Sequence, residues 1–105
     1  MSIELRYTPE ARKDLTDIWM GVWYASRDFD IADQYVNDLQ DTIEKKKLFP
    51  YSGIPLYYRN MFTGFYSVNF KAYKTFYRID SDFLEVIRIL PLKRDYLQIL
   101  FNISN

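Results

Sequence analysis

The sequence contains neither cysteine nor histidine among its 105 residues. The absence of cysteine excludes disulfides, thiolate catalysis and zinc–sulfur sites. The absence of histidine excludes Ser-His-Asp catalysis, histidine general bases and histidine metal ligands. We therefore expect no metal site and no bound cofactor, and any proton transfer must use Asp, Glu, Lys, Tyr or Arg.

The chain also has no net charge at pH 7 and no long apolar run. Fourteen Lys and Arg balance fourteen Asp and Glu, but residues 1–58 carry 7 basic and 10 acidic side chains whereas residues 59–96 carry 7 and 4. A general nucleic-acid binder would show a stronger basic excess. Because no apolar run approaches the length of a membrane span and the N-terminus lacks an apolar signal core, we expect a cytoplasmic protein with no membrane partner.

Aromatic and apolar residues, by contrast, are abundant. The hydrophobic share is 49% and the aromatic share 19%, with 10 Tyr and 8 Phe. This composition argues against disorder, and the chain is long enough to bury a core without disulfides or a metal. The length predicts a single domain spanning residues 1–105.

Hydrophobic periodicity places two helices after a short strand. Apolar residues alternate in Ile3–Tyr7, which predicts a strand with one buried face. Thr8 followed by Pro9 and Glu10 predicts a helix start, and helical spacing continues to about Ser26. Asp30 is expected to cap a second helix that ends near Leu48. The short link predicts an antiparallel helix hairpin.

The second half of the sequence predicts strands. Residues 65–70, 73–79 and 83–90 are rich in aromatic and β-branched residues, while residues 56–61 fit no single pattern. The expected fold is therefore α+β: an N-terminal strand, the helix hairpin, then a three-stranded antiparallel meander. Together these strands would form a four-stranded sheet with the helices on one face.

The register between the last two strands decides which side chains share a face. A three-residue turn, Asp80–Asp82, would place Lys74 opposite Arg88 and Arg78 opposite Leu84. A two-residue turn would shift every pair by one. With the longer turn, basic side chains gather on one face, with Phe76 between them, and apolar residues occupy the other.

These residues define a candidate binding surface, which consists of Arg59, Lys74, Phe76, Arg78, Arg88, Lys93, Arg94 and Tyr96. Lys and Arg pair with phosphate or carboxylate oxygens, and aromatic rings beside them can stack on bases. The alternative is a solvated sheet face whose charges oppose aggregation. The acid pairs Asp14/Asp17 and Asp80/Asp82 are expected to be solvated, and the apolar tail, residues 97–103, either packs into the domain or meets a partner.

Four motifs in order resemble the RelE/ParE superfamily of type II toxin–antitoxin toxins. They cover nearly the whole chain: Tyr7–Ile18, Phe49–Leu56, Ala72–Asp80 and Val86–Tyr96. The resemblance implies the same α+β fold and a cognate antitoxin that folds on binding. It also allows a homodimer or a heterotetramer with the antitoxin.

The resemblance leaves two mechanisms open. RelE-like members are metal-independent, ribosome-dependent endoribonucleases that cut messenger RNA, and here Lys74, Arg78, Arg94 and Tyr96 would be the catalytic candidates. However, Ser67 and Asn69 stand where lysines are expected, Pro91 replaces a frequent histidine, and the catalytic tyrosine position falls near Leu100 or Phe101.

ParE-like members lack that nuclease set and act on DNA gyrase. The chain is similar to them in the Tyr73–Arg78 motif and in the Arg94–Tyr96 motif. We therefore expect a ParE-like toxin that inhibits growth. The alternatives are a RelE-like endoribonuclease acting on the ribosome and its mRNA, or a degenerate module that only binds antitoxin.

Overall fold

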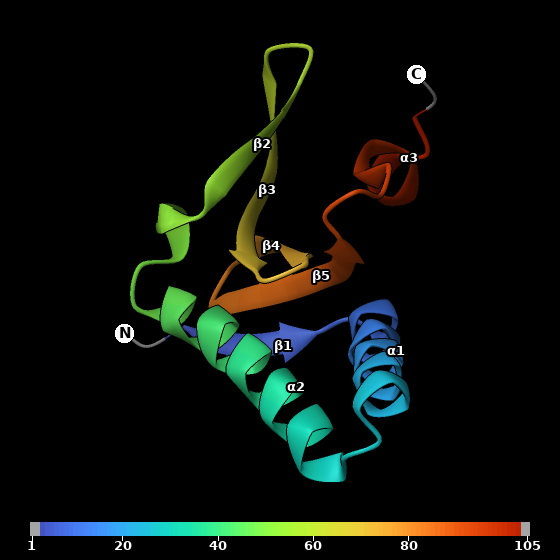
Figure 1. The fold of residues 1–105 in the computed structure, drawn as a ribbon. Coiled ribbons are helices and arrows are strands. Elements are labelled where there is room, and N and C mark those ends of the chain that lie inside the picture. Colours follow the sequence, from blue (N-terminus) through green and yellow to red (C-terminus); the bar gives the residue numbers. More distant parts are fainter. Residues whose placement is uncertain (1–2, 104–105) are drawn as a thin grey trace.

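The computed structural model describes residues 3–103 and shows an α+β fold (Figure 1). The elements follow in this order: β1 (Glu4–Tyr7), α1 (Pro9–Ser26), α2 (Phe29–Glu44), two 3₁₀ turns, η1 (Lys45–Lys47) and η2 (Pro50–Ser52), then β2 (Ile54–Tyr58), β3 (Met61–Phe70), β4 (Tyr73–Asp80), β5 (Phe83–Pro91) and α3 (Tyr96–Phe101). None of the helices in the described residues is long and apolar enough to cross a membrane.

Helix α1 has the bounds that the sequence predicted, and local signals explain both ends. The Thr8 hydroxyl accepts a hydrogen bond from the Ala11 amide, 3.1 Å away, and Pro9 occupies the first helical position. At the other end Arg27 adopts a left-handed conformation with φ of 56°, which ends the helix and turns the chain.

Helix α2 begins two residues earlier than predicted. The side chain of Asp28, not that of Asp30, accepts hydrogen bonds from the amides of Asp30 and Ile31. The helix ends at Glu44 and tightens into η1 rather than continuing to Leu48. The predicted helix hairpin is present, and α1 and α2 pack against each other and cover one face of the sheet (Figure 1).

The sheet has five strands within residues 3–103, one more than the sequence predicted. The strand order is β1-β5-β4-β3-β2, with β1 parallel to β5 and the other pairs antiparallel. The additional strand β2 begins at Ile54, two residues before the region that fitted no single pattern, residues 56–61. It contains Pro55, which is tolerated because β2 is an edge strand.

The β4–β5 turn has two residues, so the predicted register is wrong. Asp80 pairs with Phe83, and Ser81 makes the tight turn possible by adopting φ of 54°. A bulge between Tyr77 and Phe76 then shifts the register again, so that Lys74 pairs with Leu90 instead of Arg88. The shift also exchanges core residues, since Leu84 and Val86, not Phe83 and Ile87, face the helices.

The main core lies between the helices and the sheet. Its buried members include Ala11 and Ile18 from α1, Leu39 and Ile43 from α2, and Tyr77 at the sheet centre. The 4-3-4 spacing of apolar residues along each helix creates the stripes that meet this sheet face. Side-chain alternation therefore sends Lys74, Phe76 and Arg78 to the opposite, open face of the sheet.

A two-stranded ribbon projects beyond the rest of the sheet (Figure 1). Strand β3 pairs with β4 only from Phe65 onward, so residues 56–64 form a hairpin of β2 and β3 alone. Gly64 marks the point of departure and adopts φ of 87°, which a residue with a side chain rarely adopts. We call residues 56–64 the projecting ribbon.

Candidate functional site

The open face of the sheet carries a small second core under α3. The Asp95 side chain caps α3 by accepting from the Gln98 amide at 3.2 Å. The Phe101 ring packs 5.2 Å from Phe65, and Tyr96 packs 5.3 Å from Phe76, which is 1% exposed. Of the two roles considered for the apolar tail, packing onto the domain is therefore the one observed for residues 96–101.

Lys74 and Tyr96 are brought together at the edge of this second core. The Lys74 ammonium lies 5.8 Å from the centroid of the Tyr96 ring, within the range of a cation–π interaction. Both residues were catalytic candidates. Phe76, from the predicted binding set, packs beneath the same ring, so three of the predicted residues form one cluster.

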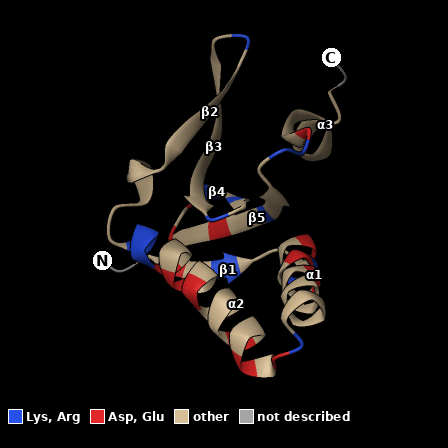
Figure 2. Cartoon of the chain, viewed as in Figure 1, with Lys and Arg blue, Asp and Glu red and all other residues tan. Residues whose placement is uncertain are grey.

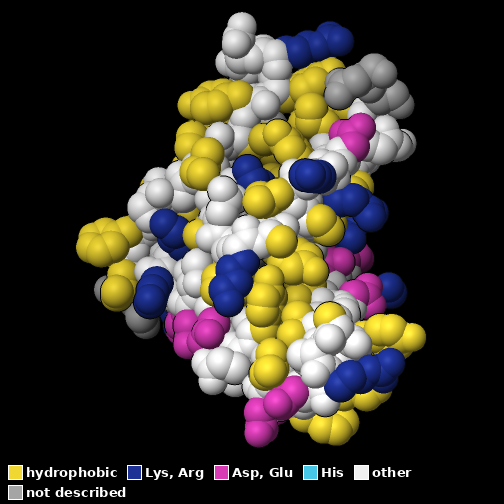
Figure 3. Space-filling model, viewed as in Figure 1, with side chains coloured by type: hydrophobic (Ala, Val, Ile, Leu, Met, Phe, Trp, Pro, Cys, Tyr) yellow, Lys and Arg dark blue, Asp and Glu magenta, His cyan; other side chains and the backbone are white. Residues whose placement is uncertain are grey.

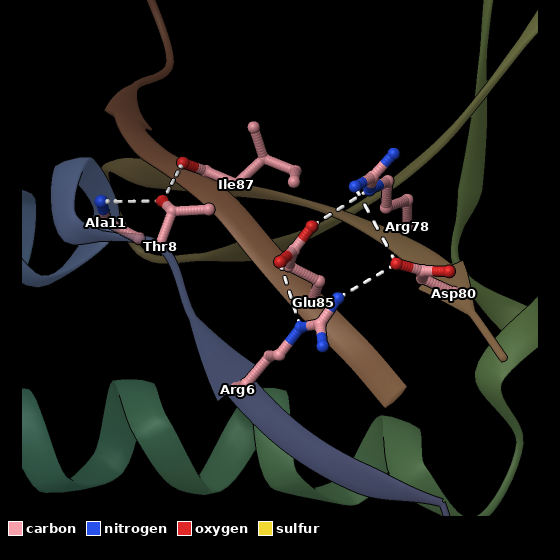
Figure 4. A network of polar contacts seen from close by, with 7 residues as sticks. All are labelled: Arg6, Thr8, Ala11, Arg78, Asp80, Glu85 and Ile87. Atoms are coloured by element: carbon pink, nitrogen blue, oxygen red, sulfur yellow. Dashed lines mark hydrogen bonds and ion pairs between the residues drawn. The ribbon is translucent and has the colours of Figure 1, made fainter. Parts of the chain in front are cut away.

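Arg78 lies on the same open face but is paired with acids (Figure 4). Its Nε donates to Glu85 at 2.9 Å, and the other oxygen of that carboxylate accepts from Arg6 Nε, also at 2.9 Å. Arg6 reaches Asp80 as well, at 2.8 Å. Two arginines and two carboxylates thus balance one another, which lowers the positive potential predicted for this face.

Arg88 does not join Lys74 and Arg78. Its guanidinium makes a bidentate pair with Asp14 of α1, with N–O distances of 2.8 and 3.0 Å. That hydrogen bonding raises the pKa of Arg88 above its usual value. The expectation of a solvated Asp14 is wrong: its carboxylate is 8% exposed and also accepts from the Ile89 amide at 2.9 Å.

The remaining basic residues are dispersed. Arg94 and Arg88 line a cleft of about 500 Å³ between α1 and the end of β5, together with acidic residues of α1. Lys93 is exposed in the preceding turn. Arg59 lies at the turn of the projecting ribbon, with its guanidinium 5.3 Å from the Tyr58 ring. The predicted basic residues therefore occupy several places rather than one concave surface.

Three residues that shape this region were missed by the sequence reasoning: Arg6, Asp14 and Glu85. Asp14 stands three residues after Ala11 and four before Ile18, so the helical stripe itself placed it toward the sheet. Arg6 and Glu85 pair only because β1 lies parallel to β5, and sequence alone did not predict that neighbour.

The chemistry available at the open face is limited. Within residues 3–103, no group of three or more His, Cys, Asp or Glu side chains could hold a metal ion. Cleavage of a phosphodiester needs cations on the developing charge and a group that activates the 2′-hydroxyl. Arg78 and Arg88 are held by acids, while the Lys74–Tyr96 pair provides one cation beside one phenol.

Comparison with protein families gives one match. The family model described as "ParE toxin of type II toxin-antitoxin system, parDE" matches residues 5–96. No curated protein sequence matches the chain. The match spans β1 to the first residue of α3 and thus includes the helix hairpin and all five strands.

Solved structures with the same fold include three toxins or toxin–antitoxin systems. A chain of the chromosomal ParDE system from P. aeruginosa has a TM-score of 0.72 at 15% identity and covers 88% of this chain and 98% of its own. The toxin–antitoxin complex RelBE2 from Mycobacterium tuberculosis gives 0.54 at 22% identity, covering 90% and 95%. The YoeB/ParE toxin from Agrobacterium tumefaciens gives 0.57 at 20% identity, covering 85% and 98%. These likenesses concern the fold.

Proposed function

Since the chain belongs to the ParE toxin family of type II toxin–antitoxin systems, we propose that it arrests growth by inhibiting DNA gyrase and that a cognate antitoxin neutralises it. The inhibition is stoichiometric: the folded surface binds gyrase, and no covalent step takes place on the chain. The protein acts in the cytoplasm, where its target lies, and it needs neither a metal ion nor a cofactor.

The pairing of the basic side chains is the observation that carries this proposal. Arg78 is held by Glu85 and Arg88 by Asp14, so neither guanidinium is poised to receive a phosphate. A nuclease would use such groups to stabilise the charge that develops in the transition state. A toxin that works by binding needs only a stable surface, and these ion pairs are compatible with that role.

The proposal is tested by expressing the chain without antitoxin and by adding purified protein to gyrase. We expect growth arrest, induction of the DNA-damage response, and accumulation of cleaved DNA in a supercoiling reaction. Relaxation of supercoiled DNA by a type I topoisomerase, a reaction that does not involve gyrase, provides the control. Intact chromosomal DNA together with unimpaired supercoiling would contradict the proposal.

A second candidate is a ribosome-dependent endoribonuclease, favoured by the contact between Lys74 and Tyr96. In that case the ammonium would hold the phosphate and the phenol would assist proton transfer. Expression should then produce cuts at codon positions in translated messages, mapped by primer extension. Lys74→Ala and Tyr96→Phe should abolish the cuts, and growth arrest that persists in both variants would remove this candidate.

The same experiments distinguish a third possibility, a module that binds antitoxin but is not toxic, from both candidates. Normal growth on expression, with the antitoxin still captured by the purified chain, would support it. In the two toxic alternatives the antitoxin instead restores growth. Co-expression of the products of genes adjacent to this one, with rescue of growth as the readout, would identify the antitoxin.

A further inference from the structure

The projecting ribbon and the loop before it expose an unusual amount of apolar surface. Seven large hydrophobic side chains within residues 48–62 are between 47% and 77% exposed: Leu48, Phe49, Tyr51, Ile54, Tyr57, Met61 and Phe62. In the space-filling view hydrophobic side chains gather along the ribbon (Figure 3). Contiguous exposed patches of this kind mark interaction sites.

Four rings of this surface form a connected row, which we call the aromatic ladder: Tyr51, Tyr57, Phe62 and Tyr66. The Tyr57 and Phe62 centroids are 5.8 Å apart, and Phe62 and Tyr66 are 5.2 Å apart. Tyr66 in turn stacks on the buried Tyr77 at 5.7 Å. The ladder is thereby anchored to the main core, so its exposed rings are held in place before any partner arrives.

Basic side chains predominate in this region. Residues 45–79 contain seven Lys and Arg and no Asp or Glu, although the whole chain is neutral. Two of the seven have acidic partners just outside this segment, since Lys47 pairs with Glu44 and Arg78 pairs with Glu85. In Figure 2 most of the red positions, which mark Asp and Glu, lie on α1 and α2, and the only coloured position on the projecting ribbon is blue, at its tip. Lys45–Lys47 lie at one end of the aromatic ladder and Arg59 at the other. An acidic partner would therefore be attracted along its length.

Both outermost strands of the sheet, β1 and β2, lack a further strand partner within residues 3–103, but only β2 contributes a ring to the aromatic ladder. Beyond the end of β1, the Ile87 carbonyl accepts from the Thr8 hydroxyl at 2.8 Å, and the Ile89 amide donates to Asp14. These side chains close that edge of β5. At the opposite end of the sheet, β2 is the outermost strand, and within residues 3–103 no further strand pairs with it. Such an edge is a template for an added strand.

We propose that β2 and the aromatic ladder form a docking site for an extended acidic segment of the cognate antitoxin. The segment adds a strand to β2, its apolar side chains cover the exposed rings, and its carboxylates meet Arg59 and the lysines of η1. This inference rests on the proposed function because that function supplies the antitoxin.

Two other occupants fit the same surface less well. A second copy of this chain would bring its own Arg59 and η1 lysines against these, and like charges repel. A single-stranded nucleic acid would use the basic residues and the rings but not the backbone groups of β2.

The site is tested by measuring the affinity of ribbon variants for antitoxin and for simple probes. The apolar variant is Tyr57→Ser with Phe62→Ser, and the charge variant is Arg59→Glu. Matched controls make the same kinds of change elsewhere: Tyr24→Ser, at a side chain 67% exposed, and Arg12→Glu on the exposed side of α1. Circular dichroism checks that every variant is folded.

The probes are the full-length antitoxin identified by co-expression, a short labelled peptide in which Glu alternates with Tyr, a Lys–Tyr peptide of equal length, and oligothymidylate. We expect the antitoxin and the Glu–Tyr peptide to bind, and the apolar variant to weaken both by about tenfold or more. The Arg59→Glu variant should weaken both and reduce their dependence on salt. The control variants should stay within about twofold.

Unchanged antitoxin affinity in both ribbon variants would overturn the proposal. So would binding of oligothymidylate in preference to the Glu–Tyr peptide, which would assign the surface to nucleic acid. These results are independent of toxicity: a chain that leaves growth normal refutes the proposed gyrase function, yet the ratio of variant to control affinities still decides where antitoxin binds.

Discussion

Two regions of the molecule, the corner between α1 and β5 and the projecting ribbon, differ in whether their charged side chains are paired. At the corner, charged groups are paired: Asp14 is 8% exposed and satisfies both the Arg88 guanidinium and the Ile89 amide. On the ribbon, Arg59 has no acidic partner among the described residues, and its guanidinium lies 5.3 Å from the Tyr58 ring. The rings there are about half exposed, whereas those beneath α3 are covered.

This difference indicates that the side chains of the corner contribute to stability, whereas those of the ribbon contribute to binding. Removing a buried charge from its partner is costly, so the corner is a place where sequence changes act on stability. Exposed rings and unpaired strand edges add little to the isolated chain, so changes there act on binding. Substitutions at matched positions in the two regions can therefore test this division.

The largest effect is expected at Asp14. Asp14→Ala removes both hydrogen bonds to Arg88 and leaves the Ile89 amide without its acceptor. We expect the free energy of unfolding to fall by about 3 kcal/mol, measured by urea denaturation. Asp17→Ala is the control, since Asp17 makes an exposed pair with Lys13, and it should cost less than about 0.5 kcal/mol. Equal losses of unfolding free energy in the two variants would show that the buried ion pair at the corner contributes no more to stability than an exposed pair.

The junction between the core and the ribbon is the next most sensitive place. A Cβ at Gly53 would collide with the Tyr77 phenol and approach the Ser67 carbonyl to 3.0 Å. Gly53→Ala should therefore destabilise the chain by about 2 kcal/mol because it overpacks a closed site. Gly21→Ala meets nothing within 4 Å and lies inside α1, so it should stabilise by about 0.5–1 kcal/mol. Thermal denaturation of both variants would reveal opposite signs, and a shared sign would contradict the steric account.

The Tyr77 phenol, at the same junction, should make the stability of the chain depend on pH. Its hydroxyl donates to the Pro50 carbonyl at 2.7 Å, and burial raises the pKa of Tyr77 to about 12. The unfolded chain loses this proton near pH 10, so native stability is complete below about pH 10 and declines as the pH rises toward 12. Tyr77→Phe should cost about 1 kcal/mol at neutral pH, and this deficit should shrink at alkaline pH.

Urea unfolding of Tyr77→Phe and the parent chain at neutral and alkaline pH measures that convergence. Tyr24→Phe removes a phenol that is 67% exposed and serves as the control. A deficit for Tyr77→Phe that stays constant with pH would mean that the phenol contributes through packing and hydrogen bonding alone.

The fold was largely predictable because its signals are local. The Thr8 cap, the apolar stripes of both helices and the alternation in β3–β5 each depend on residues close in sequence. Strand β2 was ambiguous because Pro55 and four aromatic or aliphatic neighbours fit several conformations. Only pairing with β3 decides its structure, and that pairing is a tertiary effect.

The candidate site was less predictable because it depends on register. A two-residue turn with Ser81 at positive φ, followed by a bulge, moved Lys74 away from Arg88. Asp80–Asp82 signals a turn but contains no glycine that would fix its length, and no sequence signal marks the bulge. The acids that neutralise the arginines come from elements distant in sequence, such as Asp14, 74 residues from Arg88, and an inventory of basic residues does not reveal them.

The smallest expected effect concerns the paired arginines on the open face. Glu85→Gln keeps the shape of the side chain but removes the charge shared by Arg6 and Arg78. Both guanidiniums retain contact with Asp80 and are partly exposed, so stability should fall by less than about 1 kcal/mol. The open face should become more cationic and bind heparin more strongly, eluting at higher salt than the parent chain.

Glu4→Gln makes the same change in net charge at an exposed position of β1 and should shift heparin elution less. If the two variants elute together, only net charge matters and the ion-pair network does not mask the face. If Glu85→Gln elutes later, the network suppresses anion binding on the open face. Arg59 of the projecting ribbon, which has no acidic partner among the described residues, would then be the cation available to an acidic partner, and this is the distinction between the two regions that the structure indicates.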